Sequence, residues 1–111
     1  MSGDEVAVAC TLAAIGAEEL PRHRVVVESL FGAVVERRED AEGYGFRLPP
    51  EPSFILLAAE FISRERLCCP FFRFALELEP AGGALWLRLG GPEGAKEVLR
   101  AGFADLVGVR A

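Results

Sequence analysis

Two adjacent cysteines, Cys68 and Cys69, stand directly before Pro70, and Cys10 is the only other cysteine of the chain. Thiolates select soft or borderline ions, so a vicinal pair can hold one such ion between its sulfur atoms. A disulfide within the pair would be strained, because adjacent Cα atoms lie about 3.8 Å apart and a disulfide usually spans about 4.4–6.8 Å. The spacing therefore favours a soft-metal or metalloid site over a local disulfide.

Two ligands are too few for a structural zinc ion, which nearly always has four. Cys10 supplies a third if the first predicted strand lies beside the end of the helix that contains Cys68. We therefore predict a site made of Cys10, Cys68 and Cys69, which takes zinc, copper(I), mercury(II) or arsenite. His23, the only histidine, is a weaker candidate for a fourth ligand and is interpreted as a surface residue.

Two other readings of the cysteines stay open. Cys69 could serve a thiol enzyme or redox sensor, but reactive cysteines are usually activated at helix N-termini, and this pair follows a predicted C-terminus. Free cysteine is also among the most buried residue types, so the cysteines could merely pack in a structural or interaction module. No Ser-His-Asp or H-E-x-x-H pattern is present, so we assign no catalytic residue and favour a binding protein over an enzyme.

Composition limits the class of protein. The 111 residues, 51% of them hydrophobic, suit one domain over residues 1–111. A net charge of −5 argues against binding to nucleic acid, and no apolar run reaches the roughly 20 residues of a membrane helix. Asp4 and Glu5 precede only a short apolar run, so we predict no secretory signal and a cytoplasmic protein. Three cysteines in that compartment are expected to be free thiols or metal ligands rather than a disulfide framework.

Hydrophobic periodicity predicts the elements that position the cysteines. We expect a first strand over Val6 to Leu12, and then a helix with Pro21 in its first turn and Gly32 near its end. The remaining predicted elements are two hairpins and two helices: strands 34–39 and 44–48, a helix over 52–68, strands within 72–78 and 85–89, and a helix over 93–106. The strand pairs predict an α+β fold of order β-α-β-β-α-β-β-α, with a mainly antiparallel sheet and helices on one face.

The helix over 52–68 is the clearest element. Its apolar face repeats every three or four residues and includes Glu65 and Cys68, and Pro70 makes Cys69 a hinge into the next strand. Glu60 and Glu65 are interpreted as solvated helix charges. Strand alternation and the helix faces predict a core of eight side chains: Phe54, Phe61, Phe72, Phe74, Leu76, Leu85, Leu87 and Phe103. Trp86 falls on the opposite sheet face, so either that face is partly covered or the tryptophan helps to form a partner surface. A homodimer through the open sheet face is one cover that we consider.

The segments "VACTL", "RERLCCPFFRFALELEP" and "LWLRLGGPEGAKEVL" resemble a group of small bacterial proteins of unknown function that carry a Cys-Cys-Pro-Phe motif. The resemblance spans most of the chain. It implies no activity, cofactor or small-molecule ligand, and it implies only that Cys10, Cys68 and Cys69 should be tested together.

Overall fold

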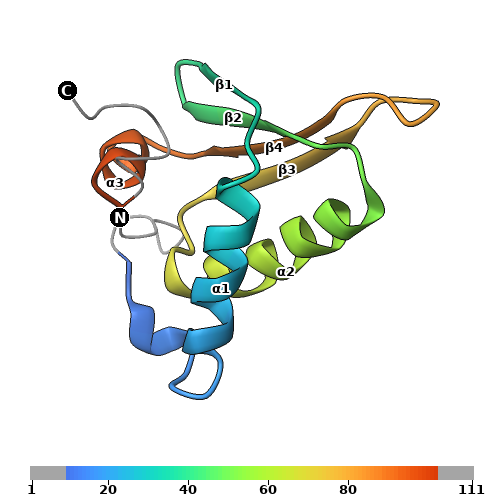
Figure 1. Ribbon diagram of the computed structural model, residues 1–111. Coiled ribbons are helices and arrows are strands. Elements are labelled where there is room, and N and C mark those ends of the chain that lie inside the picture. The colour runs from blue at the N-terminus through green and yellow to red at the C-terminus, as the bar shows by residue number, and fades with distance from the viewer. Residues whose placement is uncertain (1–9, 103–111) are drawn as a thin grey trace.

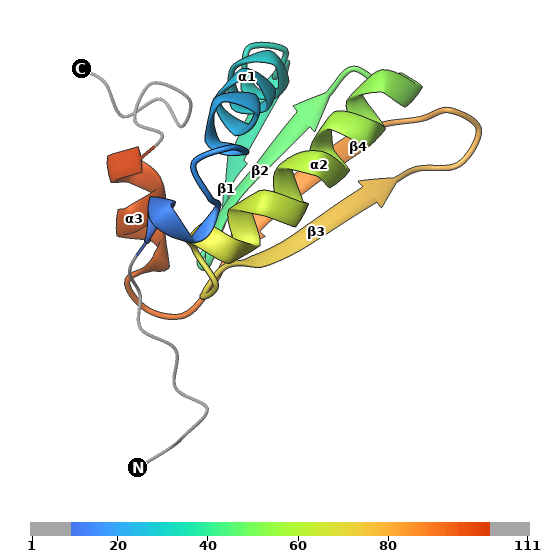
Figure 2. The ribbon, with the colours of Figure 1, turned by 90° about the horizontal axis from the view of Figure 1, so that it is seen from below.

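The computed structural model describes residues 10–102 as a four-stranded antiparallel sheet with helices on one face (Figures 1 and 2). The strands lie in the order β1-β2-β4-β3, and α1 and α2 pack side by side across the sheet. The elements in chain order are η1 (Leu12–Ala14), α1 (Leu20–Phe31), β1 (Glu36–Glu39), β2 (Gly43–Leu48), α2 (Pro52–Cys68), β3 (Arg73–Leu78), β4 (Leu85–Gly90) and α3 (Ala95–Gly102).

The predicted α+β class is confirmed, but the predicted element order is wrong at its start. Residues 6–9 of the expected first strand lie outside the described residues, and Leu12 begins the 3₁₀ helix η1 instead. The backbone N–H of Thr11 donates to the carbonyl of Cys68 at 2.9 Å, while Ala14 and Ile15 donate back to Thr11 and Leu12. These bonds use the backbone groups that a sheet ladder would need. The apolar composition of this segment predicted a strand, but it did not show that these other hydrogen bonds would use the backbone groups of Thr11 and Leu12.

Both predicted hairpins are confirmed. In the β1–β2 turn, the Asp40 carboxylate accepts hydrogen bonds from the backbone N–H groups of Glu42 and Gly43, each at 2.8 Å. The β3–β4 turn places Ala81 and Gly82 at φ values of 59° and 71°, which is the twist that a two-residue hairpin loop requires. The hairpins meet where β2 pairs with β4, so the two central strands come from different hairpins.

α2 has the predicted bounds, Pro52 to Cys68. Pro52 stands in its first turn, where the missing N–H costs no hydrogen bond, and Cys69 leaves helical geometry at φ −127° and ψ 73°. The buried positions of this helix are Ala58, Phe61, Glu65 and Cys68. Among residues 10–102, no helix combines the length and apolar character needed to cross a bilayer.

Phe61 lies at the centre of the core. Its side chain is fully buried, and its ring lies 5.2 Å from that of Phe31 and 6.2 Å from that of Phe74, in edge contacts. The predicted core is confirmed for Phe61, Phe72, Leu85 and Leu87, all of them buried. Three further predicted core residues, Phe54, Phe74 and Leu76, are only partly buried. Phe74 and Leu76 lie on the edge strand β3, and the predicted core residue Phe103 lies outside the described residues.

Trp86 is buried on the sheet face that the helices leave uncovered. The guanidinium groups of Arg38 and Arg88 lie 4.6 Å and 5.1 Å from its ring, so side chains of the same chain cover the indole. A Cβ at Gly45 would come within 2.7 Å of the Arg88 guanidinium, so a glycine on β2 leaves room for this stack. The expected partial cover is confirmed, and the homodimer stays a prediction.

Substituting Phe61→Ala should lower the free energy of unfolding by about 3–5 kcal/mol, because it opens a cavity where several rings meet. Phe74→Ala provides a matched control, since this half-buried ring on the edge strand should cost clearly less. Urea denaturation followed by circular dichroism measures both. Equal losses for the two variants would contradict the assignment of Phe61 to the centre of the core.

Candidate metal and thiol site

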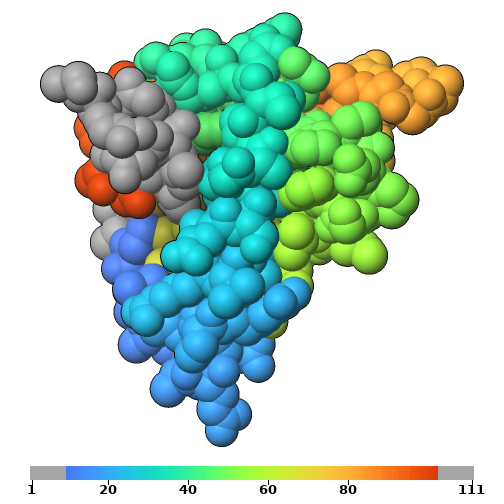
Figure 3. Space-filling view, viewed as in Figure 1, coloured from blue at the N-terminus to red at the C-terminus, as the bar shows by residue number. Residues whose placement is uncertain are grey.

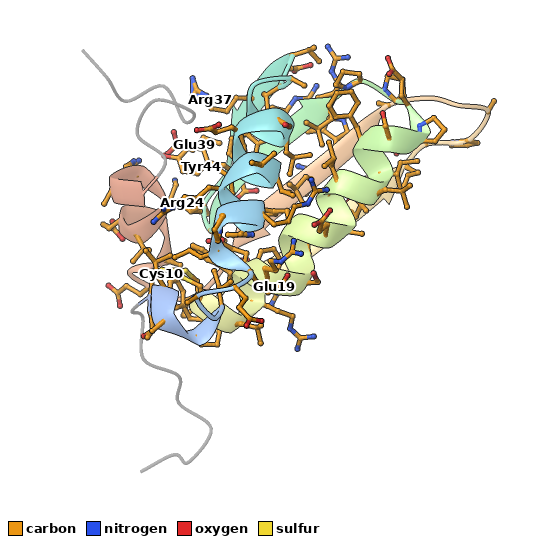
Figure 4. All side chains as sticks on the ribbon, turned by 60° about the horizontal axis from the view of Figure 1, so that its bottom comes forward. Cys10, Glu19, Arg24, Arg37, Glu39 and Tyr44 are labelled. Carbon is orange, nitrogen blue, oxygen red and sulfur yellow. A yellow bond between two sulfur atoms is a disulfide. The ribbon has the colours of Figure 1, made fainter. Side chains whose placement is uncertain are left out.

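The three cysteines meet at the C-terminal end of α2, as the sequence predicted. Their sulfur atoms all lie within 4.8 Å of one another. Cys10 and Cys69 form a disulfide with a Cα–Cα distance of 4.6 Å, and the Cys68 sulfur lies 3.4 Å from that of Cys69. Figure 4 shows Cys10 beside the end of α2. The site therefore consists of one disulfide and one free thiol in contact.

Backbone hydrogen bonds hold the cysteines in place. The N–H of Cys69 closes the last turn of α2 on the carbonyl of Glu65 at 2.8 Å, and the carbonyl of Cys68 accepts from Thr11. Cys10 and Thr11 thus lie against the end of α2, which brings Cys10 to Cys69. The predicted proximity of Cys10 is confirmed, although the expected route through a central strand is wrong.

The expectation that all three cysteines are free thiols or metal ligands rather than a disulfide is corrected by the Cys10–Cys69 bond. The sequence spacing argues only against a disulfide between the neighbours Cys68 and Cys69. Whether Cys10 and Cys69 form a disulfide depends on how the fold places these two distant residues. Cys68 and Cys69 are each 2% exposed, while Cys10 is exposed. Cys69 is buried although it lies off the apolar face of α2, because it leaves helical geometry and bonds to Cys10.

A second pair of functional groups, His23 of α1 and Glu65 of α2, lies buried beside the sulfur atoms. Their exposed fractions are 4% and 6%, and His23 Nε2 lies 2.8 Å from Glu65 Oε1. The other carboxylate oxygen, Oε2, lies 3.5 Å from the Cys69 sulfur. The His23 ring stacks on Phe61 at 5.8 Å, and its Nδ1 is buried without a hydrogen-bond partner among the described residues.

The interpretation of His23 and Glu65 as surface residues is therefore wrong. For Glu65 the signal was present in the sequence, since it shares the apolar face of α2 with Phe61 and Cys68. A carboxylate in such a position requires a buried partner. The only histidine of the chain is a natural candidate for that partner, but the sequence does not show that α1 crosses α2 at this point.

Burial shapes the protonation of the site. Desolvation raises the pKa of the Glu65 carboxyl, and the hydrogen bond from His23 opposes this rise. Desolvation also raises the pKa of the Cys68 thiol, the negative charge of Glu65 raises it further, and a backbone hydrogen bond from Thr11 opposes both. The Cys68 thiol therefore holds its proton more tightly than an ordinary cysteine does, and a thiophilic centre must displace that proton to bind.

An ion-pair network holds α1 against α2 near this pair. Arg22 makes two hydrogen bonds to the Glu60 carboxylate, at 2.7 Å and 2.8 Å, and Arg64 reaches Glu60 at 2.6 Å and Glu19 at 2.8 Å. The guanidinium groups of Arg22 and Arg64 lower the pKa of Glu60 to about 2. Glu60 is a partly exposed helix charge, in line with its interpretation as a solvated charge, and its carboxylate also links the two helices that position His23 and Glu65.

A pocket of about 450 Å³ lies directly over the cysteines. Its described lining includes all three cysteines together with His23 and Glu65. Apolar side chains from four parts of the fold form most of the remaining wall: Leu12, Leu20, Val27, Phe72 and Val98. In the space-filling view, yellow atoms from the region just after α2 are visible between α1 and the first described residues (Figure 3).

Reducing the Cys10–Cys69 disulfide should lower the free energy of unfolding by about 4 kcal/mol, because the bond closes a loop of 59 residues. Urea denaturation with and without a phosphine reductant measures the loss. Cys10→Ser should show the lower stability under both conditions, whereas Cys68→Ser keeps the disulfide and its response to reductant. Oxidised protein in which mass spectrometry finds three free thiols would contradict the bond.

Glu60→Gln should destabilise the protein at neutral pH but not near pH 2. The Glu60 pKa in the folded state, about 2, lies below its ordinary value of 4.5, so its stabilising effect is complete above about pH 4.5. That effect is lost as the pH falls from 4.5 toward 2. Denaturation of wild type and variant across this range measures the difference, with Glu79→Gln at an exposed carboxylate as the control. A difference that does not change with pH would contradict the network.

Comparisons with known proteins add no assignment. The chain matches no family model, and neither the search of curated proteins nor that of solved structures found a match. Function is therefore inferred below from the sulfur cluster, the buried His23–Glu65 pair and the pocket that they line.

Proposed function

We propose that the reduced protein binds a thiophilic metal or metalloid through Cys10, Cys68 and Cys69. The observation that carries this proposal is the meeting of the three sulfur atoms within 4.8 Å of one another. Two of these residues are adjacent and the third precedes Cys69 by 59 residues, so the fold itself assembles the cluster. Thiolates are the ligands that soft ions prefer.

Net charge favours arsenite among the candidate ligands. Three thiolates around Zn²⁺ leave one negative charge, in a buried place that already contains Glu65 and the C-terminal end of α2. Arsenite reacts as As(OH)₃ with three thiols, forms three As–S bonds and releases three waters, so the product is neutral. Mercury(II) with two thiolates is neutral as well, but it leaves the third sulfur unused. The number and burial of the sulfur atoms thus support trivalent arsenic best.

The Cys10–Cys69 disulfide supports a second function, a thiol redox sensor. In this reading the reversible event is the oxidation of Cys10 and Cys69, with Cys68 as a neighbouring thiol. Transfer of the disulfide to the Cys68–Cys69 pair would be strained, since adjacent residues are too close for an ordinary bridge. The two functions share residues, because the disulfide removes two of the three metal-binding thiols.

Anaerobic protein reduced with a phosphine should bind one equivalent of arsenite, and oxidised protein should bind none. Each of Cys10→Ser, Cys68→Ser and Cys69→Ser removes one As–S bond, so each should weaken arsenite by at least roughly tenfold. Calorimetric titration with arsenite, mercury(II), zinc and copper(I) measures the affinities. Zinc, mercury(II) and copper(I) should release protons on binding, because each displaces thiol protons into solution. Arsenite should not, because the thiol protons leave with its hydroxyl groups as water.

The variants separate the possible outcomes. Arsenite binding that ignores Cys10→Ser would show a site of two thiols rather than three. Folded, reduced wild type that binds none of the four ligands would contradict metal binding. In that case, a Cys10–Cys69 couple that equilibrates reversibly with a glutathione buffer would support the redox sensor.

A further inference from the structure

The pocket over the cysteines is larger and more apolar than a bare ion requires. Its volume of about 450 Å³ falls in the range typical of small-molecule sites, which combine apolar walls with a few polar groups. Three apolar side chains of the wall come from the first part of the described chain: Leu12 begins η1, Leu20 begins α1, and Val27 lies further along α1. The reactive sulfur atoms lie in the same wall, so one ligand can contact both.

The polar groups of the lining do not favour an ionic ligand. His23 and Glu65 are hydrogen bonded to each other, and the exposed residues Arg24 and Glu28 carry opposite charges. A ligand that occupies this space next to the thiols should therefore be uncharged, apolar at one end and reactive toward sulfur at the other.

We propose that the site takes a monosubstituted trivalent arsenical, R–As(OH)₂, with its organic group R in the apolar pocket. This inference rests on the proposed function and names its ligand class. Two cysteine thiols replace the two hydroxyl groups, two As–S bonds form, and two waters leave. The As–C bond persists and arsenic stays trivalent, so the step needs neither oxidant nor reductant.

The bonding capacity of arsenic makes this proposal distinct from the binding of arsenite. Trivalent arsenic forms three bonds, so an arsenical that keeps one As–C bond needs only two thiols. The cluster offers three sulfur atoms, with Cys68 and Cys69 in contact at 3.4 Å. A single Cys→Ser substitution at Cys10 or Cys68 leaves two thiols. Each of these variants should therefore still bind the organic arsenical, although its affinity for arsenite is lowered.

The experiment compares phenylarsine oxide, methylarsonous acid and arsenite on anaerobic, phosphine-reduced protein. The first two ligands form the same two As–S bonds and differ only in R. Each affinity is expressed relative to dithiothreitol, which offers two thiols and no pocket. The phenyl ligand should exceed the methyl ligand by more than roughly tenfold on this scale, because its ring gains apolar contact with the wall.

Wall variants locate the ring. Leu12→Ser and Val27→Ser should each reduce the normalised preference for phenyl over methyl by roughly threefold or more. Val25→Ser is the matched control, because Val25 is an exposed residue of α1 that does not line the pocket. Leu12 is itself 55% exposed, so its replacement tests the wall without disturbing the core.

The outcomes distinguish this inference from the proposed function. If arsenite binds but the normalised phenyl and methyl affinities are equal, or if the wall variants behave like Val25→Ser, the organic-group pocket is refuted and the thiol site stands. If none of the three arsenicals binds the folded, reduced protein, the proposed function fails and this inference fails with it.

Discussion

A carboxylate on the buried face of α2 needs a polar partner, and much of the structure depends on the one it finds. Glu65 lies one turn before the end of α2 and meets His23 of α1 at 2.8 Å. Because an unpaired buried carboxylate is costly, this contact constrains where α1 crosses α2. Arg22, Glu60 and Arg64 then hold the same two helices together closer to the surface. The position of the sulfur cluster follows, since Cys69 closes its turn on the backbone of Glu65.

The site places two kinds of chemistry side by side. The paired His23 and Glu65 are buried and polar, while the adjoining pocket wall is apolar. The negative end of α2 and the Glu65 carboxyl oppose extra negative charge, so the pKa of the Cys68 thiol is raised and this thiol is a poor anion. A ligand whose complex with the thiols is neutral, such as trivalent arsenic, adds no negative charge to this site. A ligand such as zinc, whose complex with three thiolates is negatively charged, does add it. The oxidised form avoids it as well, because a disulfide carries no charge.

Local rules in the sequence predicted the parts of the fold that depend on neighbouring residues. Proline positions and apolar spacing predicted the bounds of α2, and alternation predicted both hairpins. The first strand was predicted wrongly, because Thr11 donates its hydrogen bond to Cys68, more than fifty residues away. The burial of His23 and the Cys10–Cys69 bond escaped prediction for the same reason: each is decided by packing between distant segments. Only Glu65 carried a local signal that was misread.

The cover of Trp86 by Arg38 and Arg88 has an optical consequence. This indole is the only tryptophan of the chain, and it lies on the sheet face away from α1 and α2. We therefore expect its emission to report mainly whether the sheet and its arginine cover are intact, because the sulfur cluster lies on the other side of the sheet, at the end of α2. Intrinsic fluorescence thus separates loss of fold from loss of binding, while ultraviolet absorption of sulfur bonds to a heavy atom follows the ligand itself.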